Sequence, residues 1–133
     1  MEDIRWLQRF DNYKKALSHL AEIKDIDTEE TPIIIKEGFI QRFEYTFELA
    51  WKTLKDYMEY QGLKFQPSPM KTVKEAFAAG IIKDGQTFID MIESRNKTAH
   101  TYDEAVVERI FSEIKTDFYP ALEKLRVYLE GQI

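Results

Sequence analysis

Hydrophobic positions recur along most of this chain at the spacing of an α-helix. Over residues 3–24 the apolar side chains alternate in steps of four and three: Trp6, Phe10, Tyr13, Leu17 and Leu20. Thr31-Pro32 signals a second helix, whose apolar stripe continues to a stop at Gln61-Gly62: Ile40, Phe43, Phe47, Ala50, Leu54 and Met58. Both stripes suit helices that pack side by side in a bundle.

Turn and capping residues divide the second half into shorter helices. Ser68-Pro69 can open a short helix that ends at Ala79-Gly80. Asp84-Gly85 is a turn, and a fourth helix then continues up to Arg95. The last helix starts near Asp103, and a kink or break is expected near Tyr119 because a proline follows it.

No segment of useful length alternates between apolar and polar residues as a β-strand does, and only Ile33-Ile34-Ile35 is ambiguous between helix and strand. The sequence therefore predicts an all-α fold, an up-and-down bundle of about four main helices plus one short helix. At 133 residues, the chain is expected to form one domain over 1–133.

The amino-acid composition limits which cellular compartment the protein can occupy and which kinds of bonded or metal site it can contain. The chain has no cysteine, which excludes a disulfide framework and a thiolate metal site. No secretion signal is visible, and no run approaches the ~20 apolar residues of a membrane span. We therefore expect a soluble cytoplasmic protein with no membrane contact, no metal and no cofactor.

The balance of charge and aromatic residues bears on partners. A formal net charge of −5 argues against broad, charge-driven binding of nucleic acid, so such a function would have to use a local basic site. Aromatic residues make up 14% of the chain, more than a narrow core needs. We expect a homodimer that forms through aromatic surfaces.

The stretch Arg95-Asn96-Lys97-Thr98-Ala99-His100, followed by Thr101-Tyr102, carries the candidate chemistry. The guanidinium group of arginine can donate two parallel hydrogen bonds to phosphate oxygens, and the histidine side chain titrates near neutral pH. On a continuous helix Arg95 and His100 would point about 140° apart, so they can face one ligand only if the helix ends between them. Poor helix formers follow Arg95, and Asp103 signals a new start, which favours that break.

A plainer interpretation of these residues stays open. An arginine near a helix C-terminus is common because it complements the helix dipole. A single histidine beside a turn is usually solvated or satisfied by a neighbour. Chemistry at Arg95 and His100 therefore needs further support.

That support comes from a family resemblance that covers essentially the whole chain. Arg95-x4-His100-x-Tyr102 resembles the Arg-x4-6-His signature of the HEPN superfamily, and is closest to the HepT-type signature Arg-x4-His-x-Tyr. The segments 92–102 and 42–54 also resemble proteins described as nucleotidyltransferase substrate-binding proteins. The chain shows no departure from the core motif.

The resemblance implies a homodimer that acts as the toxin of a toxin–antitoxin pair, a metal-independent endoribonuclease with RNA as substrate. His100 would abstract the ribose 2′-OH proton or protonate the leaving 5′-oxygen, and Arg95 would hold the scissile phosphate. Asn96 would position the backbone or the substrate. The antitoxin partner would be a minimal nucleotidyltransferase that modifies Tyr102 with AMP.

Two acidic pairs are weaker candidates. Asp25-x-Asp27 faintly resembles the metal-binding aspartates of nucleotidyltransferases, but it lacks a preceding Gly-Ser loop, so a solvated turn is the default. Glu44 and Glu48 could form an acid–base pair. Their helical spacing fits better with the edge of a helix that faces solvent or an interface, and Glu48 and Lys52 are spaced for an ion pair on one helix.

Two functions therefore remain open from the sequence. The first is a HepT-like ribonuclease toxin, and the second is a non-catalytic helical subunit that supplies a substrate-binding surface to a nucleotidyltransferase. In the second, Arg95 and His100 bind a nucleotide or phosphate without cleaving it. Only the first hypothesis predicts that the chain cleaves RNA catalytically.

Overall fold

The computed structural model describes residues 4–97 and 103–133, and every regular element in these ranges is helical. In chain order the elements are α1 (Arg5–Leu20), a 3₁₀ turn (Ala21–Asp25), α2 (Ile33–Tyr60), α3 (Pro69–Ala78), α4 (Gly85–Lys97), α5 (Glu104–Glu113), a π-helical turn (Ile114–Phe118) and α6 (Tyr119–Glu130). The protein is an all-α helical bundle, as the sequence predicted. None of the described helices is long and apolar enough to cross a membrane.

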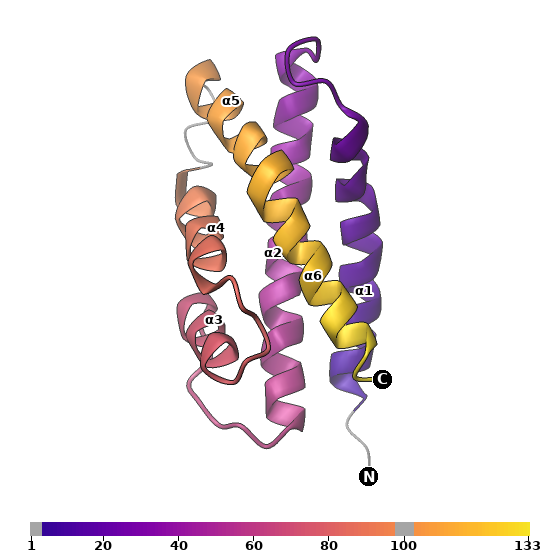
Figure 1. Ribbon diagram of the computed structural model, residues 1–133, viewed down its shortest axis with the longest axis vertical. Coiled ribbons are helices and arrows are strands. Elements are labelled where there is room, and N and C mark those ends of the chain that lie inside the picture. The colour runs from indigo at the N-terminus through magenta and orange to yellow at the C-terminus, as the bar shows by residue number, and fades with distance from the viewer. Residues whose placement is uncertain (1–3, 98–102) are drawn as a thin grey trace.

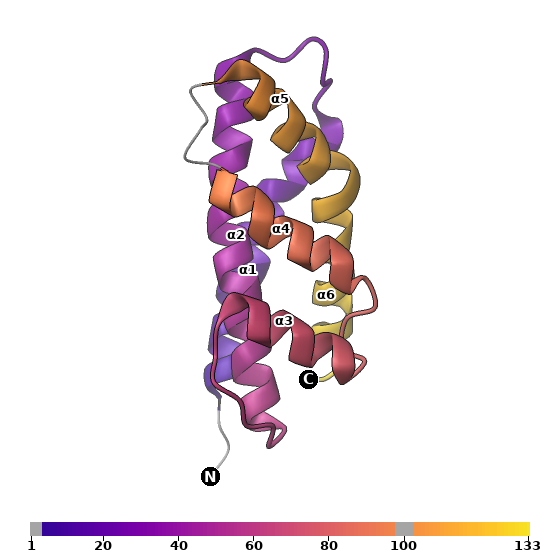
Figure 2. The same cartoon turned by 90° about the vertical axis from the view of Figure 1, so that its left-hand side faces the viewer.

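The long helix α2 is the centre of the bundle. It packs along α1 on one side and contacts α5 and α3 on others. Figure 1 shows α5 and α6 following one another across the front of α1 and α2. Figure 2 shows α3 and α4 stacked one above the other on a second side, with both helices running across α2.

The two apolar stripes predicted from the sequence form a large part of the core. Every residue named in them is buried, and Phe43 of α2 stacks on Phe118 with ring centroids 5.2 Å apart. The phenol of Tyr13 donates a hydrogen bond of 2.6 Å to the carbonyl oxygen of Leu122, which joins α1 to α6. Burial raises the pKa of Tyr13 well above its ordinary value, so this phenol stays a donor.

Two ion pairs with a buried member also hold helices together. The ammonium group of Lys36 on α2 lies 2.7 Å from the carboxylate of Glu108 on α5, and the Lys36 side chain is only 4% exposed. The guanidinium of Arg9 on α1 lies 3.0 Å from the carboxylate of Asp56 on α2, which is 1% exposed. Each pair fixes the position of one helix against α2.

Local sequence signals set the ends of the helices. Ser68 accepts a hydrogen bond from the backbone N–H of Lys71 and caps α3, as predicted. Gly62 and Gly80 end α2 and α3 with φ values of 88° and 76°, a conformation that glycine adopts without strain. The ambiguous segment Ile33–Ile35 is helical and forms the first turn of α2.

The irregularity predicted near Tyr119 is a π-helical turn. The backbone N–H of Tyr119 donates to the carbonyl oxygen of Ile114, one residue further back than in an α-helix. Pro120 then occupies the first turn of α6, where its missing N–H is tolerated. Figure 2 shows that α5 and α6 run in different directions on either side of this turn.

Candidate functional site

Arg95 lies in the last turn of α4, and the helix ends two residues later at Lys97. The next helix starts at Glu104, where the Asp103 side chain accepts a hydrogen bond of 2.9 Å from the backbone N–H of Ala105. The predicted helix start at Asp103 is confirmed, whereas the predicted helix end at 96–98 reaches into residues outside the described ranges and stays a prediction. His100 and Tyr102 lie outside the described residues, so whether they approach Arg95 stays a prediction.

The side chain of Arg95 makes an ion pair with α2. Its Nη2 atom lies 2.9 Å from Oε2 of Glu48, and Oε1 of Glu48 lies 3.3 Å from the ammonium group of Lys52. The three side chains are between 31% and 38% exposed, so they are anchored and still reach solvent. The structure thus places two cations around one carboxylate at the surface, beside the last turn of α4.

This arrangement confirms one sequence prediction and adds a contact that sequence analysis missed. The predicted Glu48–Lys52 ion pair is present. Arg95 is 47 residues away from Glu48 along the chain, so helical spacing could not have revealed their contact. Of the other predicted site residues, Asn96 lies exposed on the last turn of α4.

The opposite side of this last turn is acidic. A small polar pocket of about 110 Å³ separates α4 from α5, and it is lined by Asp90, Glu93, Ser94, Lys97, Ile110 and Glu113. Burial raises the pKa of Glu113 there, although Arg109 and Lys97 act in the other direction. Three carboxylates and one ammonium group therefore surround this pocket, which does not suit a phosphate.

The alternative acidic site has a structural role. Oδ1 of Asp27 accepts hydrogen bonds from the backbone N–H groups of Glu29 and Glu30, at 2.8 and 3.2 Å, and so stabilises the turn before α2. Within the described ranges, no three histidine or carboxylate side chains come together in a way that could hold a metal ion. Asp27 is therefore a turn residue.

Comparison with known proteins identifies a matching family and a relative by sequence. A family model described as "Nucleotidyltransferase substrate binding protein like" matches residues 8–131. A curated Haemophilus influenzae protein named "Probable ribonuclease HepT" is 27% identical over 81 residues, which cover 58% of this chain and 56% of that protein. The match thus spans about half the length of that relative.

A solved structure agrees over a longer stretch. The crystal structure of a Thermus thermophilus protein matches with a TM-score of 0.76 and 33% sequence identity. The match covers 85% of this chain and 94% of that protein. The bundle described above is therefore shared with an experimentally determined structure.

Proposed function

This chain belongs to the family of nucleotidyltransferase substrate-binding-like proteins and is HepT-like, and from that premise we propose that it is a metal-independent endoribonuclease of a toxin–antitoxin pair. The observation that supports this proposal most is the placement of Arg95. An ion pair with Glu48 anchors its guanidinium at the surface, in the last turn of α4. A phosphate-binding group held in this way is what electrostatic stabilisation of a cleavage reaction requires.

The proposed reaction needs only groups from the chain and the RNA. The ribose 2′-oxygen attacks the adjacent phosphorus, His100 takes the 2′-OH proton, and the bond from phosphorus to the 5′-oxygen breaks. His100 then gives this proton to the leaving 5′-oxygen, and a 2′,3′-cyclic phosphate remains. Arg95 binds the phosphate oxygens as negative charge develops on them, and Asn96 positions the substrate.

The proposed partner is a minimal nucleotidyltransferase that neutralises the toxin. It would transfer AMP from ATP to the phenol oxygen of Tyr102, with release of pyrophosphate. The added phosphate, two residues from His100, would occupy and charge the subsite that otherwise receives the RNA phosphate. We further propose a cytoplasmic homodimer whose cleft carries Arg95 and His100 from both subunits.

A second function is supported by the description of the matching family itself. In this alternative the chain is a non-catalytic subunit that binds substrate for the nucleotidyltransferase. Arg95 and His100 would then bind a nucleotide or a phosphate without cleaving it, and Glu48 would hold Arg95 in place.

Expression of the chain alone in a bacterial host separates the two functions. The ribonuclease predicts growth arrest, relief of that arrest by His100→Ala, and the same relief when the partner nucleotidyltransferase is co-expressed. His19→Ala removes the chain's other histidine and is the matched control, which should remain toxic. A wild-type chain that accumulates folded without slowing growth would favour the non-catalytic subunit.

A further inference from the structure

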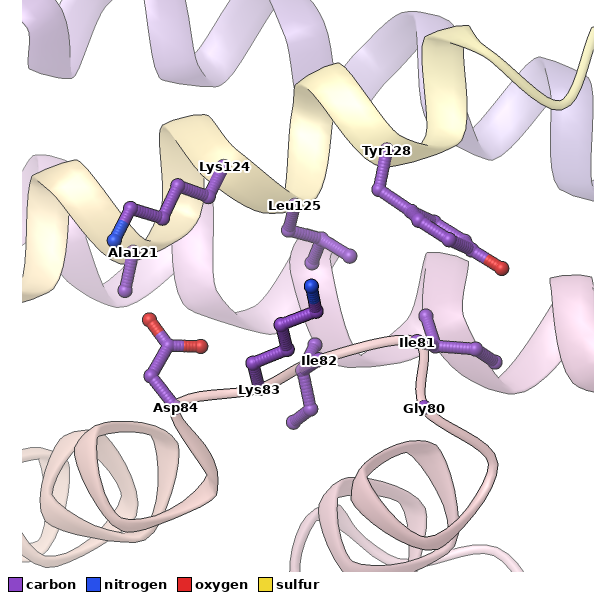
Figure 3. A pocket seen from close by; sticks show the side chains of 9 residues that line it. All are labelled: Gly80, Ile81, Ile82, Lys83, Asp84, Ala121, Lys124, Leu125 and Tyr128. Atoms are coloured by element: carbon purple, nitrogen blue, oxygen red, sulfur yellow. The ribbon is translucent and has the colours of Figure 1, made fainter.

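A larger cavity lies away from Arg95, between the connection from α3 to α4 and helix α6. Its volume is about 670 Å³, and Figure 3 shows the side chains around it: Gly80, Ile81, Ile82, Lys83, Asp84, Ala121, Lys124, Leu125 and Tyr128. Pockets of about 300–1,000 Å³ are typical of small-molecule sites. Arg95 is eleven residues further along the chain than Asp84, roughly 16 Å along α4, so the cavity is separate from the proposed ribonuclease site.

The walls of the cavity are fixed by the backbone on one side and by packing on the other. At the end of α3, the N–H of Ile81 donates to the carbonyl oxygen of Ala76, and Gly80 reverses the chain with a φ of 76°. This reversal directs Ile81 and Ile82 into the protein, where they are 8% and 4% exposed. The facing wall is the buried part of α6, with Ala121 and Leu125 at 3% and 2%.

The two ends of the cavity differ in chemistry. Figure 3 shows Tyr128 and Ile81 at one end, and Lys124, Asp84 and Ala121 at the other, with Lys83 reaching from the connection toward Leu125. Tyr128 is held by an edge-to-face contact with Tyr57, with ring centroids 6.3 Å apart. An apolar end with an aromatic wall is therefore joined to an end that carries charge.

Positive groups outnumber negative ones among the residues that line the cavity. Lys83 and Lys124 are both exposed, and neither makes an ion pair with a carboxylate in the part of the chain that the structure describes. Asp84 is the single acidic residue among the lining residues. The lining of this cavity is thus net positive, although the chain has a net charge of −5.

We propose that this cavity binds a small organic anion, a flat apolar group that carries one sulfonate, phosphate or carboxylate. The ring system would lie between Ile81, Leu125 and Tyr128, and the anionic group would lie between Lys83 and Lys124. Burial of the apolar part drives the binding, and the two ammonium groups select for the negative charge. The concave shape and the volume favour a small molecule over a peptide or nucleic-acid chain.

The test is an NMR titration of the full chain, labelled with ¹⁵N, with naphthalene-1-sulfonate as the probe. The backbone amide signals of Ile81, Ile82 and Leu125 should shift along one saturable curve. In the variant Lys83→Ala/Lys124→Ala the dissociation constant should rise about tenfold, since each partly exposed ion pair contributes modestly. The neutral naphthalene-1-sulfonamide should bind the wild type more weakly by a similar factor.

Two controls make the result specific. Lys15→Ala/Lys64→Ala removes the same charge from exposed positions outside the cavity and should leave the dissociation constant unchanged. Ala121→Leu, which fills the cavity, should abolish the shifts, provided that its unfolding curve shows a folded protein. Equal affinity for the sulfonate and the sulfonamide, no effect of the double variant at Lys83 and Lys124, or shifts confined to other surfaces would each overturn the proposal.

Discussion

The guanidinium of Arg95 on α4 lies 2.9 Å from the carboxylate of Glu48 on α2, and this contact ties the arginine of the motif to the central helix of the bundle. Because α2 is packed on several sides, Glu48 has a fixed position from which to orient Arg95. A phosphate-binding arginine whose direction is set by a rigid helix is better placed for catalysis than a solvated one.

Removal of the Glu48 carboxylate should therefore impair the proposed ribonuclease. We expect Glu48→Ala to lower kcat about tenfold or more while the protein stays folded, because Arg95 loses this contact with α2 and keeps its charge. Steady-state cleavage of an RNA substrate measures this effect, with Glu44→Ala, one turn away on the same helix, as the control. Wild-type kcat in Glu48→Ala would show that Glu48 does not position Arg95.

The ion pair between Lys36 and Glu108 predicts an asymmetry in stability. Glu108→Ala leaves the ammonium group of Lys36, which is 4% exposed, without its partner and should lower the free energy of unfolding by about 3 kcal/mol. Lys36→Met should cost less, because the remaining Glu108 is 49% exposed and can be solvated. Urea unfolding of both variants measures the difference, and a larger loss in Lys36→Met would contradict this account.

The raised pKa of Glu113 predicts a stability change that depends on pH. Burial raises this pKa, so the folded protein holds the proton more tightly than the unfolded chain. The ionised carboxylate therefore lowers stability above the folded pKa, and this cost disappears as the pH falls below the unfolded value near 4.5. Glu113→Gln should have a higher Tm than wild type at pH 7 and lose that advantage toward pH 4.

A matched variant separates this local effect from the general relief of negative charge. Glu37→Gln removes the same charge at an exposed position of α2, where no such burial exists. Thermal unfolding of the wild type and both variants at pH 7 and pH 4 gives the comparison. A gain in Tm for Glu113→Gln no larger than that for Glu37→Gln would show that burial of Glu113 is not the cause.

Much of the fold follows from local sequence. The apolar stripe from Trp6 to Leu20 predicts α1 because helical periodicity depends only on neighbouring residues. Ser68 and Asp103 predict helix starts because an N-cap is a contact within one turn, and both caps are present. Pro120 predicts an irregularity at the correct place, but its form, a π-helical turn, depends on how α5 and α6 pack.

The contacts at the site depend on the tertiary structure and could not be predicted in this way. Glu48 lies on α2 and Arg95 on α4, and helix α3 separates them along the chain. Lys36 is likewise 72 residues away from its partner Glu108. Hydrophobic periodicity identifies which face of a helix is buried, but it does not identify the residues of other helices that this face contacts. The cavity beside Gly80 likewise exists only because α6 lies across the connection from α3 to α4.

Cleavage of a tRNA pool by the purified protein in excess chelator tests the central claim most directly. The account predicts cleavage that leaves 2′,3′-cyclic phosphate ends, that is lost in Arg95→Ala and in His100→Ala, and that persists in His19→Ala. Absence of cleavage by folded protein that carries no AMP on Tyr102, or full cleavage by both variants of the motif, would contradict it.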